Sequence, residues 1–180
     1  MTNKKHAIFL DRDGVINKEV NYLADPAQFE FIPGSIEALK IFKQNGFLLI
    51  VITNQAGIAR GFFSEETLNQ IHNKMKKILN QNGIILDDIF YCPHHPDFTG
   101  QCDCRKPKPG MILKAQRKYN IDLQASFMVG DTLIDIKTGQ AANCKTVLVL
   151  TGYGRKERDK ILSIKPDYIF ENLLEFAKSF

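Results

Sequence analysis

The sequence predicts an α/β protein built on a doubly wound, Rossmann-like parallel sheet. Short apolar runs that suit buried strands alternate along the chain with segments of helical periodicity, the pattern of parallel strands joined by helices. Polar or acidic residues directly follow several of these runs, as they do where strands end at a ligand-binding edge. A length of 180 residues suits one core, so we expect a single domain over residues 1–180.

The first half of the chain contains two strand–helix pairs. A strand that ends at Leu10 is followed by a polar connection over 17–33 and by a helix over 35–44 with apolar residues at helical spacing. A continuous apolar strand over 47–52 comes next, and then a long amphipathic helix capped by Ser64. The long connection predicts a substrate-binding loop or a lid beside the first strand.

The second half continues the alternation. A strand over 89–91 leads into a loop rich in Cys and His, and a helix follows over 109–119. Strands over 127–129 and 146–150 flank a helix over 133–142. The last expected elements are a helix over 155–164, a strand over 168–170 and a helical tail.

Composition and charge exclude several classes of function. The 44% hydrophobic and 24% charged residues are ordinary for a globular protein. Neither a membrane-spanning run nor a secretory signal is present in the sequence, which predicts a cytoplasmic location and no membrane partner. The surplus of 24 Lys and Arg over 20 acids is scattered, which argues against nucleic acid and suits a small anionic substrate. No apolar stripe is left over for a partner chain, so we expect a monomer.

Two acids, Asp11 and Asp13, follow the first strand. Because strand side chains alternate, both should project to one side, with Arg12 pointing away. Like charges this close repel unless one acid holds a proton or a cation joins them, and we expect a hard divalent ion, Mg²⁺, to supply the missing charge. Asp131, which ends the strand over 127–129, is the expected third oxygen donor. Taken alone, two solvated acids at a strand end would be the simpler interpretation.

Thr53 follows the second strand as the two acids follow the first. Its hydroxyl and the backbone N–H groups of Asn54 and Gln55 would suit the oxygens of a phosphate group. A simple Thr-Asn turn is the alternative. The parallel arrangement brings Thr53 to the same edge of the sheet as the acids.

A basic segment precedes the helix that starts at 109. Lys106 on a loop stiffened by prolines would neutralise a transferring phosphoryl group, and Arg105 would grip a second phosphate. For Lys108, an exposed basic loop is an equally simple interpretation. Asp135 either orients Asp131 and the basic segment or merely stabilises the first turn of its helix.

The loop over 92–104 has the ligand spacing of a zinc site. A Cys-x-His pair and a Cys-x-Cys pair are separated by seven residues, and four protein ligands leave no position for water, which predicts a structural zinc. His95 is an alternative to His94, and free thiols in a loop are disfavoured because three cysteines and two histidines fall within thirteen residues. A zinc knuckle for nucleic acid is disfavoured because no basic and aromatic surface surrounds it. Cys144, outside this loop, is expected in the core. The expected zinc ligands are Cys92, His94, Cys102 and Cys104.

Together these motifs resemble the haloacid dehalogenase-like phosphatases over about residues 7–152. The resemblance is carried, in order, by Asp11-Arg12-Asp13-Gly14, Thr53, Lys106 and Gly130-Asp131. Within that superfamily, longer motifs resemble the heptose bisphosphate phosphatases, and the histidinol-phosphate phosphatases are similar, zinc loop included. These longer motifs cover 29–34, 53–61, 92–96 and 102–111.

The resemblance implies a haloacid dehalogenase-like core without a large cap domain, with the zinc loop 92–104 inserted in it. The implied reaction is Mg²⁺-dependent removal of the 7-phosphate of a heptose 1,7-bisphosphate, with histidinol phosphate or another small sugar phosphate as the alternative substrate. The loop over 17–33 and the zinc loop would then cover the site. The substrate would be the only partner.

The resemblance also assigns residues. Asp11 is the implied nucleophile that forms an aspartyl-phosphate, and Asp13 the general acid and base. Thr53 and Lys106 would stabilise the phosphoryl group. The implied magnesium ligands are Asp11, the backbone carbonyl of Asp13 and Asp131. The implied substrate contacts are Glu19, Val20, Asn21, Tyr22, Thr53, Asn54, Gln55, Ala56, Arg105, Lys106 and Thr132.

Two interpretations from other functional classes are less favoured. A phospho-receiver module also combines clustered acids, a Thr and a Lys on a doubly wound sheet, but Asp13 and the zinc loop argue against it. A zinc-ribbon interaction protein without catalysis is disfavoured because the acids are intact. We assign no function to His6 or His72.

Overall fold

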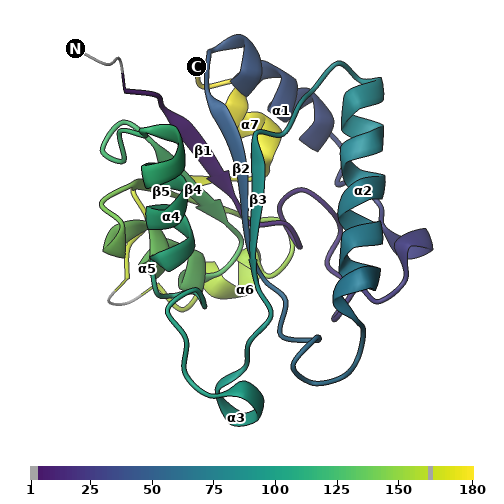
Figure 1. The fold of residues 1–180 in the computed structure, drawn as a ribbon. Coiled ribbons are helices and arrows are strands. Elements are labelled where there is room, and N and C mark those ends of the chain that lie inside the picture. The colour runs from purple at the N-terminus through teal and green to yellow at the C-terminus, as the bar shows by residue number, and fades with distance from the viewer. Residues whose placement is uncertain (1–3, 162–163) are drawn as a thin grey trace.

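A six-stranded parallel sheet forms the centre of the computed structural model, which describes residues 4–161 and 164–180 (Figure 1). The strands lie in the order β3-β2-β1-β4-β5-β6 and every neighbouring pair is parallel. The predicted doubly wound α/β fold is therefore confirmed. The strands are β1 (Ala7–Leu10), β2 (Leu48–Asn54), β3 (Asp88–Cys92), β4 (Phe127–Gly130), β5 (Lys145–Val149) and β6 (Tyr168–Phe170).

Helices cover both faces of the sheet (Figure 1). One face packs against α1, α2 and α7, and the other against α4 and α5. The alternation within β1 shows why both faces are apolar: Ile8 and Leu10 belong to the first core, whereas Phe9 belongs to the second. The helices are α1 (Ser35–Gln44), α2 (Glu65–Gln81), α3 (Pro96–Thr99), α4 (Gly110–Tyr119), α5 (Leu133–Ala141), α6 (Gly154–Arg158) and α7 (Leu173–Ala177), with a 3-10 turn η1 (Pro26–Gln28).

The predicted elements differ from the observed ones in three places, the first being the 3-10 turn η1 within the connection over 17–33. The loop over 92–104 contains the short helix α3, which the sequence analysis did not predict. The helix expected over 155–164 ends at Arg158, and residues 162–163 of that expectation lie outside the described residues. Across the described ranges, no helix combines the length and the apolar character that crossing a membrane requires.

The sheet changes its direction of growth between β1 and β4. The chain lays β2 and β3 on one side of β1 and then returns to place β4 on the other side. The loops after β1 and β4 therefore diverge and leave a crevice at the carboxyl ends of the strands, where doubly wound sheets bind ligands. Asp11 follows β1 and Asp131 follows β4, so the fold brings both acids to this crevice.

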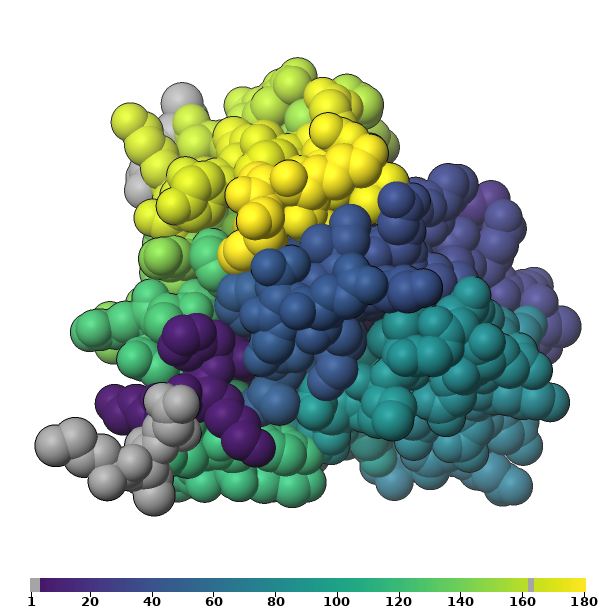
Figure 2. Space-filling view, turned by 90° about the horizontal axis from the view of Figure 1, so that it is seen from above, coloured from purple at the N-terminus to yellow at the C-terminus, as the bar shows by residue number. Residues whose placement is uncertain are grey.

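An aromatic cluster holds the C-terminal helix against the core. The ring of Phe176 lies 5.3 Å, between centroids, from the rings of both Phe42 and Phe127. Phe180 joins the same cluster but remains 48% exposed. Figure 2 shows these last residues, in yellow, lying against the blue residues of α1. The tail is therefore part of the core that supports one face of the sheet.

Replacing Phe176 with alanine should lower the free energy of unfolding by about 3–5 kcal/mol, because the side chain is buried and the cavity cannot fully collapse. Urea unfolding of the variant measures this loss. Phe180→Ala makes the same change at a half-exposed position and should cost clearly less. Equal losses in the two variants would contradict the anchoring role of Phe176.

Candidate active site

A buried lysine joins two acids at the carboxyl end of the sheet. The Nζ atom of Lys106 lies 3.0 Å from Oδ1 of Asp11 and 2.6 Å from Oδ1 of Asp135. Burial by itself lowers the pKa of Lys106, but the two carboxylates outweigh burial and the pKa is raised. Lys106 therefore stays charged and is fixed beside Asp11.

Asn54, the last residue of β2, holds the backbone of Lys106. Its Oδ1 accepts the N–H of Lys106 at 3.0 Å, and its Nδ2 donates to the carbonyl of Lys106 at 3.2 Å. The neighbouring N–H of Gln55 donates to the carbonyl of Cys92 at 2.8 Å. The prediction that the backbone N–H of Gln55 binds a phosphate oxygen is therefore wrong, because that N–H already has a partner.

The strand alternation predicted that Arg12 points away from the acids, and this prediction is wrong. Arg12 is fully buried, and its Nη2 donates to Oδ1 and Oδ2 of Asp13 at 2.8 and 2.7 Å. Asn17 and Gln55 each add a side-chain N–H to the same carboxylate, at 2.9 and 3.0 Å. Although burial raises the pKa of Asp13, the charge of Arg12 and these hydrogen bonds outweigh it and lower the pKa. The Asp13 carboxylate is therefore ionised and already paired.

His72 supports Arg12 from α2. Its Nε2 lies 3.3 Å from Nη1 of Arg12, and because a guanidinium can only donate, Nε2 is the acceptor. Burial lowers the pKa of His72 to about 3, so the ring is neutral. The sequence analysis assigned no function to this residue. His72 lies four residues after Leu68 and three before Met75, which places it on the buried side of the helix. This spacing was the feature of the sequence that could have predicted its burial.

Asp131 is wedged between two glycines. A Cβ atom on Gly14, at φ +80°, or on Gly152 would come within 2.1 Å of its Oδ2, so only glycine allows this approach. The same Oδ2 accepts the N–H of Tyr153 at 2.8 Å. Burial above all raises the pKa of Asp131 to about 8 and, in spite of Lys106, that of Asp11 to about 7. Lys106 supplies one positive charge to Asp11 and Asp131, and a second one would be needed to balance both carboxylates.

The chemistry of the oxygen donors fits a hard divalent cation. Carboxylate oxygens of Asp11, Asp131 and Asp135 lie within 4.8 Å of one another. Asp135 already uses Oδ1 for Lys106 and Oδ2 for the hydroxyl of Thr132, so Asp11 and Asp131 are the better placed ligands.

The carboxylate of Asp13 does not join this group of oxygens, because Arg12 holds it. The prediction that the side chains of Asp11 and Asp13 share a cation is therefore wrong for Asp13. The magnesium ligand that the resemblance implies on Asp13 is its backbone carbonyl, and this ligand stays a prediction.

Two pockets lie at the carboxyl end of the sheet, and one of them opens over these groups. The smaller, of about 230 Å³, lies directly over Asp11 and Lys106. The larger, of about 700 Å³, extends past Ile32 and Lys156. Glu19 and Tyr153 line both pockets, so the two pockets adjoin.

The predicted substrate contacts separate into groups. Val20 and Asn21 line the larger pocket, whereas Gln55 and Ala56 are buried, and Nε2 of Gln55 bonds Asp13 and Thr53. Tyr22 packs edge-on against Phe62, with ring centroids 4.8 Å apart. The predicted residues that line the smaller pocket are Glu19, Thr53, Asn54, Arg105, Lys106 and Thr132.

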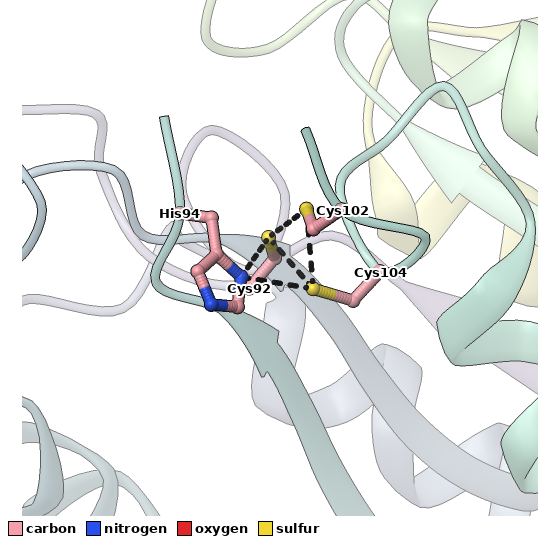
Figure 3. Close-up of side chains that lie close together, drawn as sticks. All are labelled: Cys92, His94, Cys102 and Cys104. Atoms are coloured by element: carbon pink, nitrogen blue, oxygen red, sulfur yellow. Dashed lines mark hydrogen bonds between the residues drawn. The ribbon is translucent and has the colours of Figure 1, made fainter. Parts of the chain in front are cut away.

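Four side chains converge at the end of β3 in the loop over 92–104 (Figure 3). The Sγ atoms of Cys92 and Cys104 are 3.0 Å apart, and Nδ1 of His94 lies 3.3 Å from Sγ of Cys104. With Cys102, these atoms lie within 4.8 Å of one another, and three sulfurs and one imidazole suit tetrahedral zinc. His95, the alternative ligand, faces Arg60 instead, with Nε2 at 2.8 Å from Nη2.

Comparisons with known proteins find a hydrolase family model and several heptose bisphosphate phosphatases. A family model described as "HAD-hyrolase-like" matches residues 103–176. The D-glycero-beta-D-manno-heptose-1,7-bisphosphate 7-phosphatase of Pasteurella multocida (strain Pm70) is 48% identical over 179 residues, 97% of this chain and 96% of the relative. The protein of that name from Escherichia coli (strain K12) is 48% identical over 158 residues, 84% of this chain and 83% of the relative.

The comparisons also include the other anomer and a metal-bound structure. A D-glycero-alpha-D-manno-heptose-1,7-bisphosphate 7-phosphatase of Photorhabdus laumondii is 45% identical over 161 residues, 86% of this chain and 88% of the relative. The D,D-heptose 1.7-bisphosphate phosphatase from B. bronchiseptica, solved in complex with magnesium and phosphate, has a TM-score of 0.89 and 39% identity, covering 97% of both chains.

His72 should make the protein sensitive to mild acid. Its pKa is lowered from 6.5 to about 3 on folding, so its contribution to stability is complete above pH 6.5 and is lost as the pH falls. Between pH 7 and pH 5, His72→Gln should lose about 2 kcal/mol less free energy of unfolding than the wild type. Urea unfolding at both pH values measures this difference. His6→Gln, the same change at an exposed position, should behave as the wild type; a His72→Gln variant that did so would contradict the buried neutral ring.

Proposed function

This chain belongs to the D-glycero-D-manno-heptose-1,7-bisphosphate 7-phosphatase family of haloacid dehalogenase-like hydrolases, and we propose that it removes the 7-phosphate through an aspartyl-phosphate on Asp11. It is accordingly a phosphomonoesterase. The observation that carries the mechanism is the position of Asp11, 3.0 Å from the buried ammonium of Lys106 and across the crevice from Asp131. Identity of 48% over nearly the whole chain supports the substrate.

Magnesium would be held by Asp11, Asp131 and the backbone carbonyl of Asp13. The donor set supports this assignment, and the related phosphatase from B. bronchiseptica was solved with magnesium. When bound, the ion screens the repulsion between carboxylate and phosphate and polarises the phosphoryl oxygens. Its positive charge would also lower the pKa values of Asp11 and Asp131, which burial and neighbouring carboxylates raise.

In the first step, the carboxylate oxygen of Asp11 that faces away from Lys106 attacks phosphorus. A bond forms between this oxygen and phosphorus as the bond from phosphorus to the sugar oxygen breaks. Lys106 and the hydroxyl of Thr53 stabilise the charge on the phosphoryl oxygens. Because Asp135 and Asn54 fix Lys106 in advance, its charge needs no rearrangement at the moment of transfer.

Asp13 moves the protons in both steps. It donates one to the leaving sugar oxygen and then takes one from the water that hydrolyses the aspartyl-phosphate, which restores Asp11 and releases phosphate. The hydrogen bonds from Arg12, Asn17 and Gln55 favour its ionised form. The negative charge of a bound phosphate raises the pKa of a neighbouring carboxyl group and shifts Asp13 toward the protonated form that the first step needs.

The zinc loop would position the distal half of the substrate. Arg105 directly follows Cys104, and its Nη1 donates to the carbonyl of His94 at 3.1 Å. Its planar guanidinium suits the second phosphate, which two parallel hydrogen bonds can hold. A zinc ion with four protein ligands has no open position for water, so its role here would be structural.

Family membership removes the support for the two non-enzymatic interpretations. A long-lived aspartyl-phosphate without turnover would be the sign of a receiver module. The single domain over 1–180, the monomeric state and the cytoplasmic location stay predictions.

A substrate panel tests the proposed function. Initial rates with Mg²⁺ on both anomers of the heptose 1,7-bisphosphate should exceed those on fructose bisphosphate and histidinol phosphate, and a preference for histidinol phosphate would overturn the substrate. Asp11→Asn should lower kcat by about three orders of magnitude or more, while its circular dichroism spectrum and its zinc content stay those of the wild type. Asp159→Asn makes the same change at an exposed position and should retain activity. Near-normal turnover by Asp11→Asn would refute the nucleophile.

Removing the zinc should lower the free energy of unfolding by several kcal/mol, because metal binding is coupled to the folding of the loop. Cys104→Ser should lose zinc, as measured by metal analysis, and should speed hydrogen exchange over 105–110. Cys144→Ser, at a buried cysteine away from the cluster, should keep one zinc per chain. Full zinc content in Cys104→Ser would exclude Cys104 as a ligand.

A further inference from the structure

Arg60 connects three loops around the two pockets. Its guanidinium carbon lies 5.8 Å from the ring centroid of Tyr22 and 5.5 Å from that of Phe98. Its Nη2 lies 2.8 Å from Nε2 of His95. Tyr22 belongs to the loop after β1, Arg60 to the loop after β2, and the other two residues to the zinc loop. One side chain therefore bridges all three.

The contact with His95 fixes the orientation of that ring. Because the guanidinium can only donate, Nε2 of His95 is the acceptor in this contact. On the other side of the ring, Nδ1 lies 3.2 Å from the backbone nitrogen of Asp97, so the ring is held from both sides. The Nε atom of Arg60 is buried and has no hydrogen-bond partner among the described residues, which costs free energy. Stacking and the bond to His95 must therefore hold the guanidinium in place.

The loop after β1 needs such a support. Asn21 and Tyr22 have φ values of +46° and +65°, in the left-handed region that costs a residue other than glycine about 1–3 kcal/mol. The ring of Tyr22 is held by Phe62 on one side and by the guanidinium of Arg60. Asn21 lines the larger pocket, which shares Glu19 and Tyr153 with the pocket over Asp11. The contacts of Tyr22 therefore determine where a pocket-lining residue lies.

We propose that Arg60 is a positioning residue that locks the loop of Tyr22 to the zinc loop and so shapes the outer part of the substrate site. The inference rests on the proposed function, because only a substrate with a sugar and a second phosphate reaches that part. Arg60 itself does not line the pocket over Asp11. Its loss should therefore affect long substrates and leave the phosphoryl-transfer groups in place.

The test compares two substrates of different length. Arg60→Ala should lower kcat/KM for the heptose bisphosphate about 10- to 100-fold, mainly through KM, because small displacements of positioning groups are costly. With p-nitrophenyl phosphate, which has no second phosphate, kcat/KM should stay within about twofold. Arg60→Lys should not restore the activity, because an ammonium cannot stack as a planar guanidinium does. Arg117→Ala, at an exposed position on α4, is the matched control and should behave as the wild type.

Phe98→Ala provides a second test that does not endanger the fold, because this side chain is 58% exposed. It should show a smaller loss of the same kind, and the double variant should lose little more than Arg60→Ala alone, because both act through one contact. Equal losses on the two substrates, or no loss on the bisphosphate, would overturn the proposal.

The outcome is separable from that of the proposed function. A wild-type enzyme that does not prefer the heptose bisphosphate would refute the substrate alone. Hydrogen exchange over residues 19–23, measured without substrate, then decides the role of Arg60. Faster exchange in Arg60→Ala supports the proposal, and unchanged exchange overturns it.

Discussion

The site depends on one ammonium group buried between two carboxylates. Lys106 is almost inaccessible to water, and its charge persists only because Asp11 and Asp135 face it. This arrangement sets the direction in which Asp11 can react, because Lys106 and the N–H of Arg12 bind its Oδ1, whereas no hydrogen bond among the described residues reaches its Oδ2. It also explains why Gly130 is a glycine: a Cβ there would come within 2.1 Å of the Cβ of Asp135, which must lie this close to reach Lys106.

The acids of the site were predictable because parallel topology places strand ends side by side. Asp11, Thr53 and Asp131 each follow an apolar run, and a doubly wound sheet brings such positions to one edge. Side-chain direction beyond the strand end was not predictable in this way. Arg12 lies two residues past β1, where the chain turns toward Gly14 and strand alternation no longer applies, so it faces Asp13 and α2.

The contacts that link separate loops were also beyond the sequence. Arg60 and His95 are 35 residues apart, and no periodicity relates a loop after β2 to the turn that precedes α3. The Cys-x-His spacing favoured His94 as the zinc ligand, and the structure confirms that its ring faces the cysteines, but the contact of His95 with Arg60 had no signal in the sequence. Strand ends thus fix the groups that act on phosphorus, whereas side-chain contacts between loops determine the shape of the pockets around these groups.

The neighbours of β1 have a consequence for how the protein is made. The first strand pairs with β4, whose residues leave the ribosome only after more than two thirds of the chain has been synthesised. Until then Asp11 has neither Asp131 nor Asp135 nearby, and one edge of β1 lacks its hydrogen-bonding partner. A nascent chain of that length therefore cannot form the complete site, and the protein becomes catalytically competent only once β4 has paired with β1.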